Sequence, residues 1–303
     1  MTTGHPADND VEPIDREDKR EDGIDERRPP TVSPSHLIEA VARREIRTVV
    51  RTPTFALLAV VLVAVLVGIT RLGGGARAGY VPATADLLTP LELLVPTVAV
   101  AFGYRAVLDD ARRGELDVLR TYPLTPRQFV LGVYLGRAIG LLAAIILPLL
   151  AAMATVALTE TPSIRFYATH AGSDSPVLFL RVIVLTAVFG LVVLAVAVAI
   201  SAIASTIKNG LALALVALVL LLFGADLALV SGLNTDLIGD SWFVYVLAAS
   251  PNSAYRGLIL ESTISVVSGT GPRAASPLVS VFSLILWTVV SLIGATVAVS
   301  RQS

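Results

Sequence analysis

Few residues in this 303-residue chain have the types and spacing that covalent or metal chemistry needs. The chain contains no cysteine, which excludes disulfides, thiolate metal sites and cysteine nucleophiles. Its three histidines, His5, His36 and His170, are scattered singly, and the sequence holds neither a His-Glu-x-x-His motif nor a Gly-x-Ser-x-Gly motif. We therefore predict no catalytic residue, no metal site and no cofactor bound by this chain.

Two acids, Glu92 and Asp226, lie within long apolar stretches and could do chemistry at membrane depth. An ionisable residue inside a membrane is by default a candidate functional residue. Both acids lie near the end of their stretch that is assigned below to the outside, where water reaches them. We therefore interpret them as outer gate candidates rather than as a cargo or proton site.

A charged loop, residues 108–128, separates two of the apolar stretches. We predict a short charged helix in this loop, which Pro123 would end. Residues 125–128, Thr-Pro-Arg-Gln, then form a capping box with Pro at the first helical position, which restarts the chain as a membrane span. A short helix held between two spans can receive a push from a cytosolic partner. A solvated connecting loop fits the same periodicity and capping equally well.

The composition requires most of the chain to lie in a membrane. Hydrophobic residues make up 54%, charged residues only 16%, and the mean hydropathy is +0.76, whereas a soluble domain has about 25% charged residues. A span needs about 20 apolar residues, and continuous apolar runs in lipid form helices because no water satisfies the backbone there. We predict an all-α polytopic membrane domain, residues 35–303, with six transmembrane helices. The predicted spans are residues 52–70, 87–107, 129–158, 177–206, 210–230 and 278–299.

Basic residues orient these spans, because they concentrate in cytosolic loops. With a cytosolic N-terminus, twelve basic residues flank the spans inside and six flank them outside. The loop 108–128 is the most basic of all. We predict a multi-pass protein of the plasma membrane with both termini in the cytosol.

The net charge of −1 conceals a division between tail and body. Residues 1–30 carry ten acids and five bases, a net −5, whereas the rest carries a net +4. Because the segment 1–34 has almost no apolar periodicity, we predict a disordered acidic cytosolic tail. Ser33 and Pro34 then suit a helix start, and apolar residues interleaved with arginines predict an amphipathic helix on the cytosolic membrane surface. A cytosolic extension of the first span is the alternative.

Small and charged residues within the spans suggest how the helices pack. Gly132, Gly136 and Gly140 repeat every four residues and form a ridge that another helix can approach closely. The third and fourth spans are longer than a membrane requires. We predict that Arg137 and Arg181 snorkel from them to the inner and outer interfaces, respectively.

The segment 232–277 is too broken to span, and it contains aromatic residues that prefer the headgroup region. We predict outer interfacial or re-entrant helices here. Pro251, Tyr255 and Arg256 are further outer gate candidates.

The charged loop resembles a known family signature. Gly114–Leu119, then Tyr122–Arg127, then Val130–Gly132 look like the Gly-x-Leu-acidic run, Pro-hydrophobic-Ser/Thr-x-Arg element and glycine-containing helix of exporter-type (type-2) ABC transporter permeases. Ser250–Arg256 is similar to the Asn-Pro-x-x-Ala-x-Arg element of the subfamily that includes nitrous-oxide-reductase maturation permeases. Asp109–Arg113 departs from the more common Glu-rich lead-in, and Ser replaces the usual Asn at 250, so the subfamily and the cargo stay open.

The resemblance implies a permease subunit rather than an enzyme. Two permease chains, identical or related, would dock on separate ATPase subunits that hold ATP and magnesium, and the helix at 113–120 would be the coupling helix. Residues 73–75 are three glycines without the Gly-Lys-Ser/Thr of a phosphate-binding loop, so the ATPase must be another chain. Lipid is the other expected partner, and nucleic acid is not. The coupling-loop candidates are Arg112, Arg113, Gly114, Glu115, Leu116, Asp117, Leu119, Arg120, Pro123 and Arg127.

Two other classes of function are alternatives. An ion-coupled secondary transporter would need internal repeats and charged or broken helices at the midplane, and the sequence shows no clear repeat. An intramembrane aspartyl protease would need two facing acids, for which Asp226 has only Glu92 as a possible mate.

Overall fold

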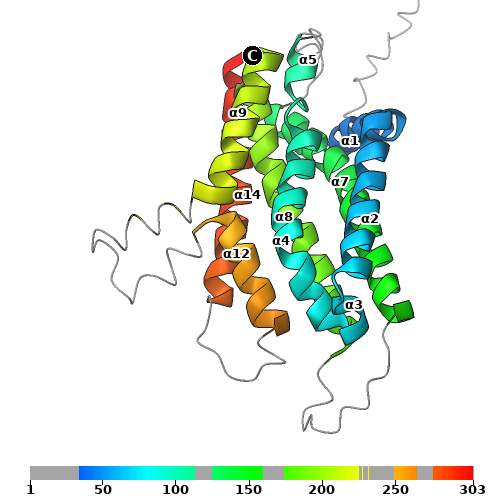
Figure 1. Ribbon diagram of the computed structural model, residues 1–303. Coiled ribbons are helices and arrows are strands. Elements are labelled where there is room, and N and C mark those ends of the chain that lie inside the picture. Colours follow the sequence, from blue (N-terminus) through cyan, green and yellow to red (C-terminus); the bar gives the residue numbers. More distant parts are fainter. Residues whose placement is uncertain are drawn as a thin grey trace, which may run out of the picture. The chain divides into compact units, whose positions relative to one another are not determined.

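The structure is a computed structural model that describes residues 34–112, 125–159, 174–224, 249–264 and 276–302, with residues 227 and 231. Throughout these residues the chain forms helices joined by turns and short extended links, without a strand (Figure 1). The all-α prediction is therefore confirmed for the part of the chain that is described.

Within the described residues, six helices are long and apolar enough to cross a membrane, which confirms the predicted number of spans. Their ends differ from the predicted ones, most of all at the second span, which starts at Tyr80 rather than at residue 87. The six are α2 (Pro53–Leu72), α4 (Tyr80–Gly103), α7 (Pro126–Thr159), α8 (Pro176–Ile203), α9 (Ile207–Val219) with the π-helical turn η1 (Leu220–Gly224), and α14 (Pro277–Gln302).

Proline begins several of these helices, because its missing N–H would have no partner in the first turn. The helix α7 also has the predicted capping box. The Thr125 N–H donates to Gln128 Oε1 at 2.9 Å, and the Gln128 N–H donates to Thr125 Oγ1 at 3.4 Å. The capping box is therefore confirmed.

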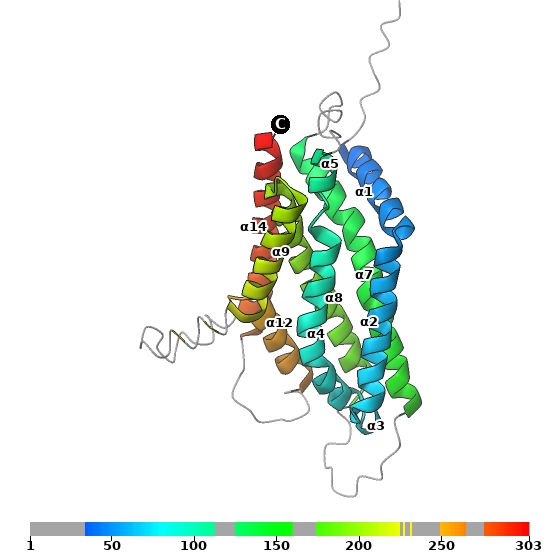
Figure 2. The ribbon, with the colours of Figure 1, turned by 45° about the horizontal axis from the view of Figure 1, so that its top comes forward.

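The helix α1 (Pro34–Arg51) precedes the first span as a separate helix. Thr52 has an extended backbone, with φ −91° and ψ 109°, because the residue before a proline is disfavoured in the helical region. The chain therefore turns between α1 and α2, and α1 packs along the beginning of α7 (Figure 2). The alternative of a continuous extension of the first span is wrong.

Side chains at the two ends of α8 bond to the backbone at the start of α4 and at the start of α5 (Leu108–Arg112). Asp174, just before α8, accepts hydrogen bonds from the backbone N–H groups of Tyr80 and Val81 at 3.0 and 2.9 Å. Near the other end of α8, Ser201 Oγ accepts from the N–H groups of Val107 and Leu108 at 3.0 and 3.1 Å. These bonds satisfy backbone donors that a helix start leaves free, and the two bonds to Asp174 explain why α4 begins earlier than hydropathy alone suggests.

The helices α4, α7 and α8 form the core, whereas α2, α9 and α14 are mostly exposed. Leu91, Ile145 and Phe189 are fully buried examples of the core side chains. The exposed surfaces of α2, α9 and α14 are apolar, as expected for surfaces that contact lipid or another membrane-spanning chain.

Four short helical segments complete the described part. They are α3 (Gly75–Ala78), α5 (Leu108–Arg112), α12 (Pro251–Ile259) and the π-helical turn η2 (Leu260–Ile264). Figure 1 places α5 and the C-terminal end of α14 at the same end of the bundle as α1, and α3 at the opposite end. We call these the α1 end and the α3 end.

Candidate functional site

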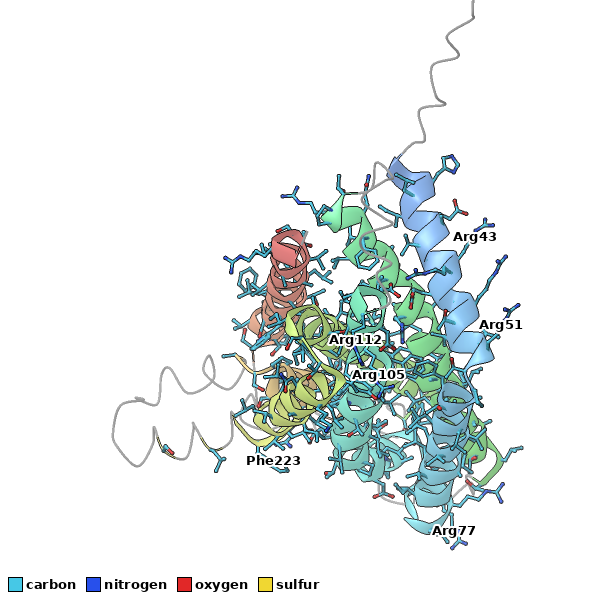
Figure 3. The ribbon with its side chains drawn as sticks, turned by 90° about the horizontal axis from the view of Figure 1, so that it is seen from above. Arg43, Arg51, Arg77, Arg105, Arg112 and Phe223 are labelled. Carbon is cyan, nitrogen blue, oxygen red and sulfur yellow. The ribbon has the colours of Figure 1, made fainter. Side chains whose placement is uncertain are left out.

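The described residues show the two anchors of the charged loop but not its centre. Arg112 ends α5, Arg127 lies in the first turn of α7, and both are exposed at the α1 end (Figure 3 labels Arg112). Residues 113–124 lie outside the described residues. The predicted short coupling helix, with Arg113, Gly114, Glu115, Leu116, Asp117, Leu119, Arg120 and Pro123, therefore stays a prediction.

A chain of charged groups connects both anchors of this loop to α1. Asp110 of α5 forms an ion pair with Arg44 of α1, and Arg44 also lies 3.1 Å from Glu45 Oε1. The other oxygen of Glu45 accepts from Arg137 Nε of α7 at 2.6 Å. Arg137 Nη1 donates to the Phe102 carbonyl oxygen of α4 at 3.0 Å. We call Arg44, Glu45, Asp110 and Arg137 the α1 charge cluster.

Arg137 is buried and does not snorkel, so that prediction is wrong. Its side chain is only 9% exposed, and that of its partner Glu45 is 3% exposed. The guanidinium also lies 5.8 Å from the centre of the Phe55 ring. A buried charge with a counter-charge and hydrogen bonds is tolerated inside a protein, and Glu45 and the Phe102 carbonyl oxygen supply both to Arg137. Arg181, by contrast, is exposed and donates to the Ser262 carbonyl oxygen at 3.1 Å.

The glycine ridge of α7 faces mainly α1, and Gly140 also approaches Phe102 of the span α4. A Cβ atom on Gly132 would lie 2.6 Å from Val41 Cβ, and one on Gly140 would lie 2.5 Å from Val49 Cγ1. Gly136, between them, faces Glu45 and Ala42. Small residues let two helix backbones approach closely. The absent side chains therefore make room for α1 and bring Glu45 within reach of Arg137.

Glu45 is a functional candidate that the sequence reasoning missed. A signal was present, because Val41, Glu45 and Val49 are spaced by four and share one face of α1. An acid in the centre of an apolar stripe needs a buried partner. Arg137 directly follows Gly136, the central glycine of the ridge on α7, whose glycines are also spaced by four. The equal spacing on α1 and α7 could have identified Glu45 and Arg137 as partners.

A second charge pair lies within the span bundle. Arg256 of α12 donates from Nε to Glu92 Oε1 at 2.6 Å and from Nη2 to Glu92 Oε2 at 2.5 Å, the two-bond geometry in which arginine holds a carboxylate best. The Glu92 side chain is 6% exposed, whereas that of Arg256 is 43% exposed. We call this pair the α4–α12 clamp.

Glu92 is in the middle of α4, not near its end as we predicted from hydropathy. The reason is the early start of α4 at Tyr80, which the Asp174 cap fixes. The carboxylate therefore lies deeper along its helix than expected, and the partner that compensates it comes from the segment between the fifth and sixth spans.

Hydrogen bonds and ring stacking hold α12 against neighbouring spans. The fully buried Tyr255 hydroxyl lies 2.9 Å from Thr186 Oγ1 of α8, and its ring stacks on Phe189 with centroids 4.5 Å apart. The Ala249 carbonyl oxygen, before α12, accepts from Trp287 Nε1 of α14 at 2.9 Å. Pro251 is buried at the start of α12. Four of the gate candidates are thus described, and three of them are on α12.

Asp226 lies outside the described residues, so its pairing with Glu92 stays untested. Among the described residues, no group of three or more His, Cys, Asp or Glu side chains is arranged to hold a metal ion. The carboxylates of both clusters are bonded to arginines, an arrangement that holds helices together.

Comparison with known proteins identifies the family. A model of the ABC-2 family transporter proteins matches residues 39–303. A probable ABC transporter permease protein NosY from Pseudomonas aeruginosa is 29% identical over 276 residues, covering 88% of this chain and 96% of that protein. A protein of the same name from Stutzerimonas stutzeri is 26% identical over 257 residues, covering 82% and 90%. These matches confirm the family that the sequence resembles, and this multi-pass membrane chain belongs to the ABC-2 family of transporters.

Proposed function

We propose that this chain is the permease subunit of an ABC exporter in the plasma membrane, which couples ATP hydrolysis on a separate ATPase subunit to translocation of a cargo. Membership of the family supports a transporter subunit rather than an enzyme, and it implies an ATPase partner. Two permease chains, identical or related, would form the pathway. Both termini and the loop 108–128 face the cytosol in this proposal, because of the excess of basic residues at those positions.

The observation that carries the proposal is the anchoring of the loop at 113–124. Its two anchors, α5 and α7, are both bonded to α1 through the α1 charge cluster. A push on the loop by an ATPase would therefore move α1, α5 and α7 together rather than bend a free connector. The Phe102 carbonyl bond from Arg137 extends the connection to α4.

The α4–α12 clamp supplies the second part of the mechanism. The helix α4 passes from the charge cluster at its end to Glu92 at its middle, so a displacement of α4 changes the position of Glu92 relative to Arg256. In this scheme the clamp holds α12 in a closed position and releases it when α4 moves. Glu92, Pro251, Tyr255 and Arg256 act as gate residues.

The test uses the chain reconstituted in liposomes with its ATPase. Capture of the solubilised full chain should recover a soluble ATPase. In the liposomes, the variants Arg113→Ala and Asp117→Ala should still allow ATP hydrolysis, but hydrolysis should no longer move α12. Because the chain has no cysteine, a single cysteine in place of the buried Ser253 reports opening by its rate of reaction with a maleimide.

ATP should raise this rate several-fold in the parent chain and not in the two loop variants. The matched control is Arg301→Ala, which removes an exposed arginine from α14 at the same α1 end. Normal coupling in both loop variants would reject the assignment of the loop. Recovery of the chain without any ATPase would reject the class of transporter.

An ion-coupled transporter has one observation in its favour, the position of Glu92 at the middle of α4. Charged residues near the midplane are typical of that class. The paired state of Glu92 counts against it, since the Arg256 guanidinium occupies both carboxylate oxygens. Opening of α12 by a proton gradient in liposomes that lack the ATPase would favour this second function.

A further inference from the structure

The helix α1 has a second charged face, opposite the one that packs on α7. Arg43, Arg47 and Arg51 are spaced by four, so they lie on one side of the helix, and all three are exposed. Figure 3 shows Arg43 and Arg51 pointing away from the bundle. Val41, Glu45 and Val49 lie on the other side of α1, which packs against α7. We call these three arginines the arginine row.

A shallow groove runs along this face of α1. Its volume is about 440 Å³, and it is lined by Ala40, Arg43, Arg44, Arg47, Thr48 and Arg51. Arg43 forms an ion pair with Glu39 at 2.5 Å, and Arg44 belongs to the α1 charge cluster. Among the described residues, Arg47 and Arg51 have no ion-pair partner within 4.0 Å. The lining therefore carries a surplus of positive charge.

The lengths of the neighbouring helices place this groove at the level of the lipid headgroups. The helix α2 has 20 residues, about 30 Å, which is the thickness of the hydrocarbon layer, and it begins at Pro53, directly after Arg51 and the turn at Thr52. The helix α7 has 34 residues, about 50 Å, so part of it extends beyond the hydrocarbon. The helix α1 packs on the first part of α7, at Gly132, Gly136 and Gly140.

We propose that the arginine row binds the phosphate of an anionic phospholipid, such as phosphatidylglycerol, in the leaflet at the α1 end. Guanidinium groups form charge-assisted hydrogen bonds with phosphate oxygens in a fixed planar geometry. The same helix carries Glu45 on its opposite face, so a bound lipid holds α1 against α7 and supports the Glu45–Arg137 pair. The proposal needs only the six spans and the position of α1, and it stands apart from the proposed transport function.

The experiment measures lipid retention by the full chain in detergent with native mass spectrometry. The purified chain is titrated with phosphatidylglycerol and, separately, with phosphatidylcholine of the same acyl length. We expect the first phosphatidylglycerol to bind at least tenfold more tightly than phosphatidylcholine. A basic residue near a membrane surface changes the binding constant about fivefold, so Arg43→Gln/Arg47→Gln/Arg51→Gln should remove most of this preference.

Two controls separate a specific site from general charge. The variant Arg71→Gln/Arg77→Gln/Arg301→Gln removes three exposed arginines elsewhere and should keep the preference. The variant Arg43→Lys/Arg47→Lys/Arg51→Lys keeps the charge but loses the planar guanidinium groups, so it should bind phosphatidylglycerol more weakly than the parent chain and more tightly than the triple Gln variant. If the triple Gln variant does not fold, Arg47→Gln alone should still lower the affinity for phosphatidylglycerol about fivefold.

Several results would overturn the proposal. Equal affinity for the two lipids in the parent chain would show no headgroup selection, and equal losses in the row and control variants would show only a general charge effect. Competition by millimolar inorganic phosphate would indicate a site for free anions. If the triple Gln variant keeps its preference for phosphatidylglycerol but no longer recovers the ATPase, this face of α1 binds the ATPase rather than lipid.

Discussion

Two buried carboxylates, Glu45 and Glu92, are each paired with an arginine from another helix, yet their surroundings differ. In the α1 charge cluster, Arg137 is 9% exposed and Glu45 is 3% exposed, so both partners are enclosed. In the α4–α12 clamp, Glu92 is 6% exposed but Arg256 is 43% exposed. A pair that is enclosed on both sides is costly to separate, because neither ion regains water. A pair with one open side separates more readily, because water solvates the arginine that leaves.

In the proposed mechanism this difference suits the two pairs to different roles. The enclosed pair joins α1 to α7 close to the anchors of the charged loop, where the proposal needs a rigid connection to transmit a push. The open pair holds the short helix α12, whose release the proposal takes to open the path. Each pair can be changed separately, and the expected effects run from large to small.

The largest effect is expected for Glu45→Ala. Arg137 then stays buried without its carboxylate, and breaking a buried pair in this way costs about 3–5 kcal/mol. The melting temperature of the chain in detergent should fall steeply. The matched control Glu45→Leu/Arg137→Leu removes both charges and should recover much of the loss. A single variant as stable as the parent would contradict the enclosed character of this pair.

A smaller destabilisation is expected for Gly136→Ala. A Cβ at this position collides with Glu45 and with the backbone of Ala42, so α1 must move away from α7, and overpacking costs about 1–3 kcal/mol. A Cβ added at Gly294 would meet no heavy atom within 4 Å, so Gly294→Ala should instead stabilise its helix by up to about 1 kcal/mol. Thermal unfolding of the two variants should shift in opposite directions, and equal shifts would reject the close approach of α1.

The clamp variant Glu92→Gln should change opening more than stability. It removes the charge but keeps a hydrogen-bonding side chain, and the half-exposed Arg256 limits the loss to about 1 kcal/mol. Maleimide labelling of a cysteine at buried Ser253 should become several-fold faster. Glu39→Gln, which breaks an exposed pair on α1, is the control and should leave the rate unchanged. An unchanged rate in the clamp variant would mean that Arg256 does not hold α12.

The smallest effect is expected for Tyr255→Phe. The change removes one hydroxyl from α12, while Thr186 keeps its own bond to the Val182 carbonyl oxygen at 2.7 Å. The loss should therefore lie near the lower end of the ~0.5–1.5 kcal/mol typical of a hydrogen bond. A double-mutant cycle with Thr186→Val measures the coupling directly. Coupling near zero would show that stacking on Phe189 alone positions the ring.

Hydropathy and capping patterns predicted the six spans and the capping box of residues 125–128, because these depend on neighbours in the sequence. The same reasoning misplaced the ends of α4 and the depth of Glu92. The end of α4 is fixed by Asp174, which is far away in the sequence, and no local pattern contains that partner. Arg137 was misjudged for the same reason, because its carboxylate is supplied by α1.

The sequence by itself determined that this is a helical membrane protein of six spans, because apolar length and backbone satisfaction in lipid leave few other solutions. It also provided the family motifs in the loop and at residues 250–256. Only the tertiary structure decided which charges meet. Ion pairing depends on the distance between side chains in space, and the pairs Glu45–Arg137 and Glu92–Arg256 join residues that the chain holds far apart.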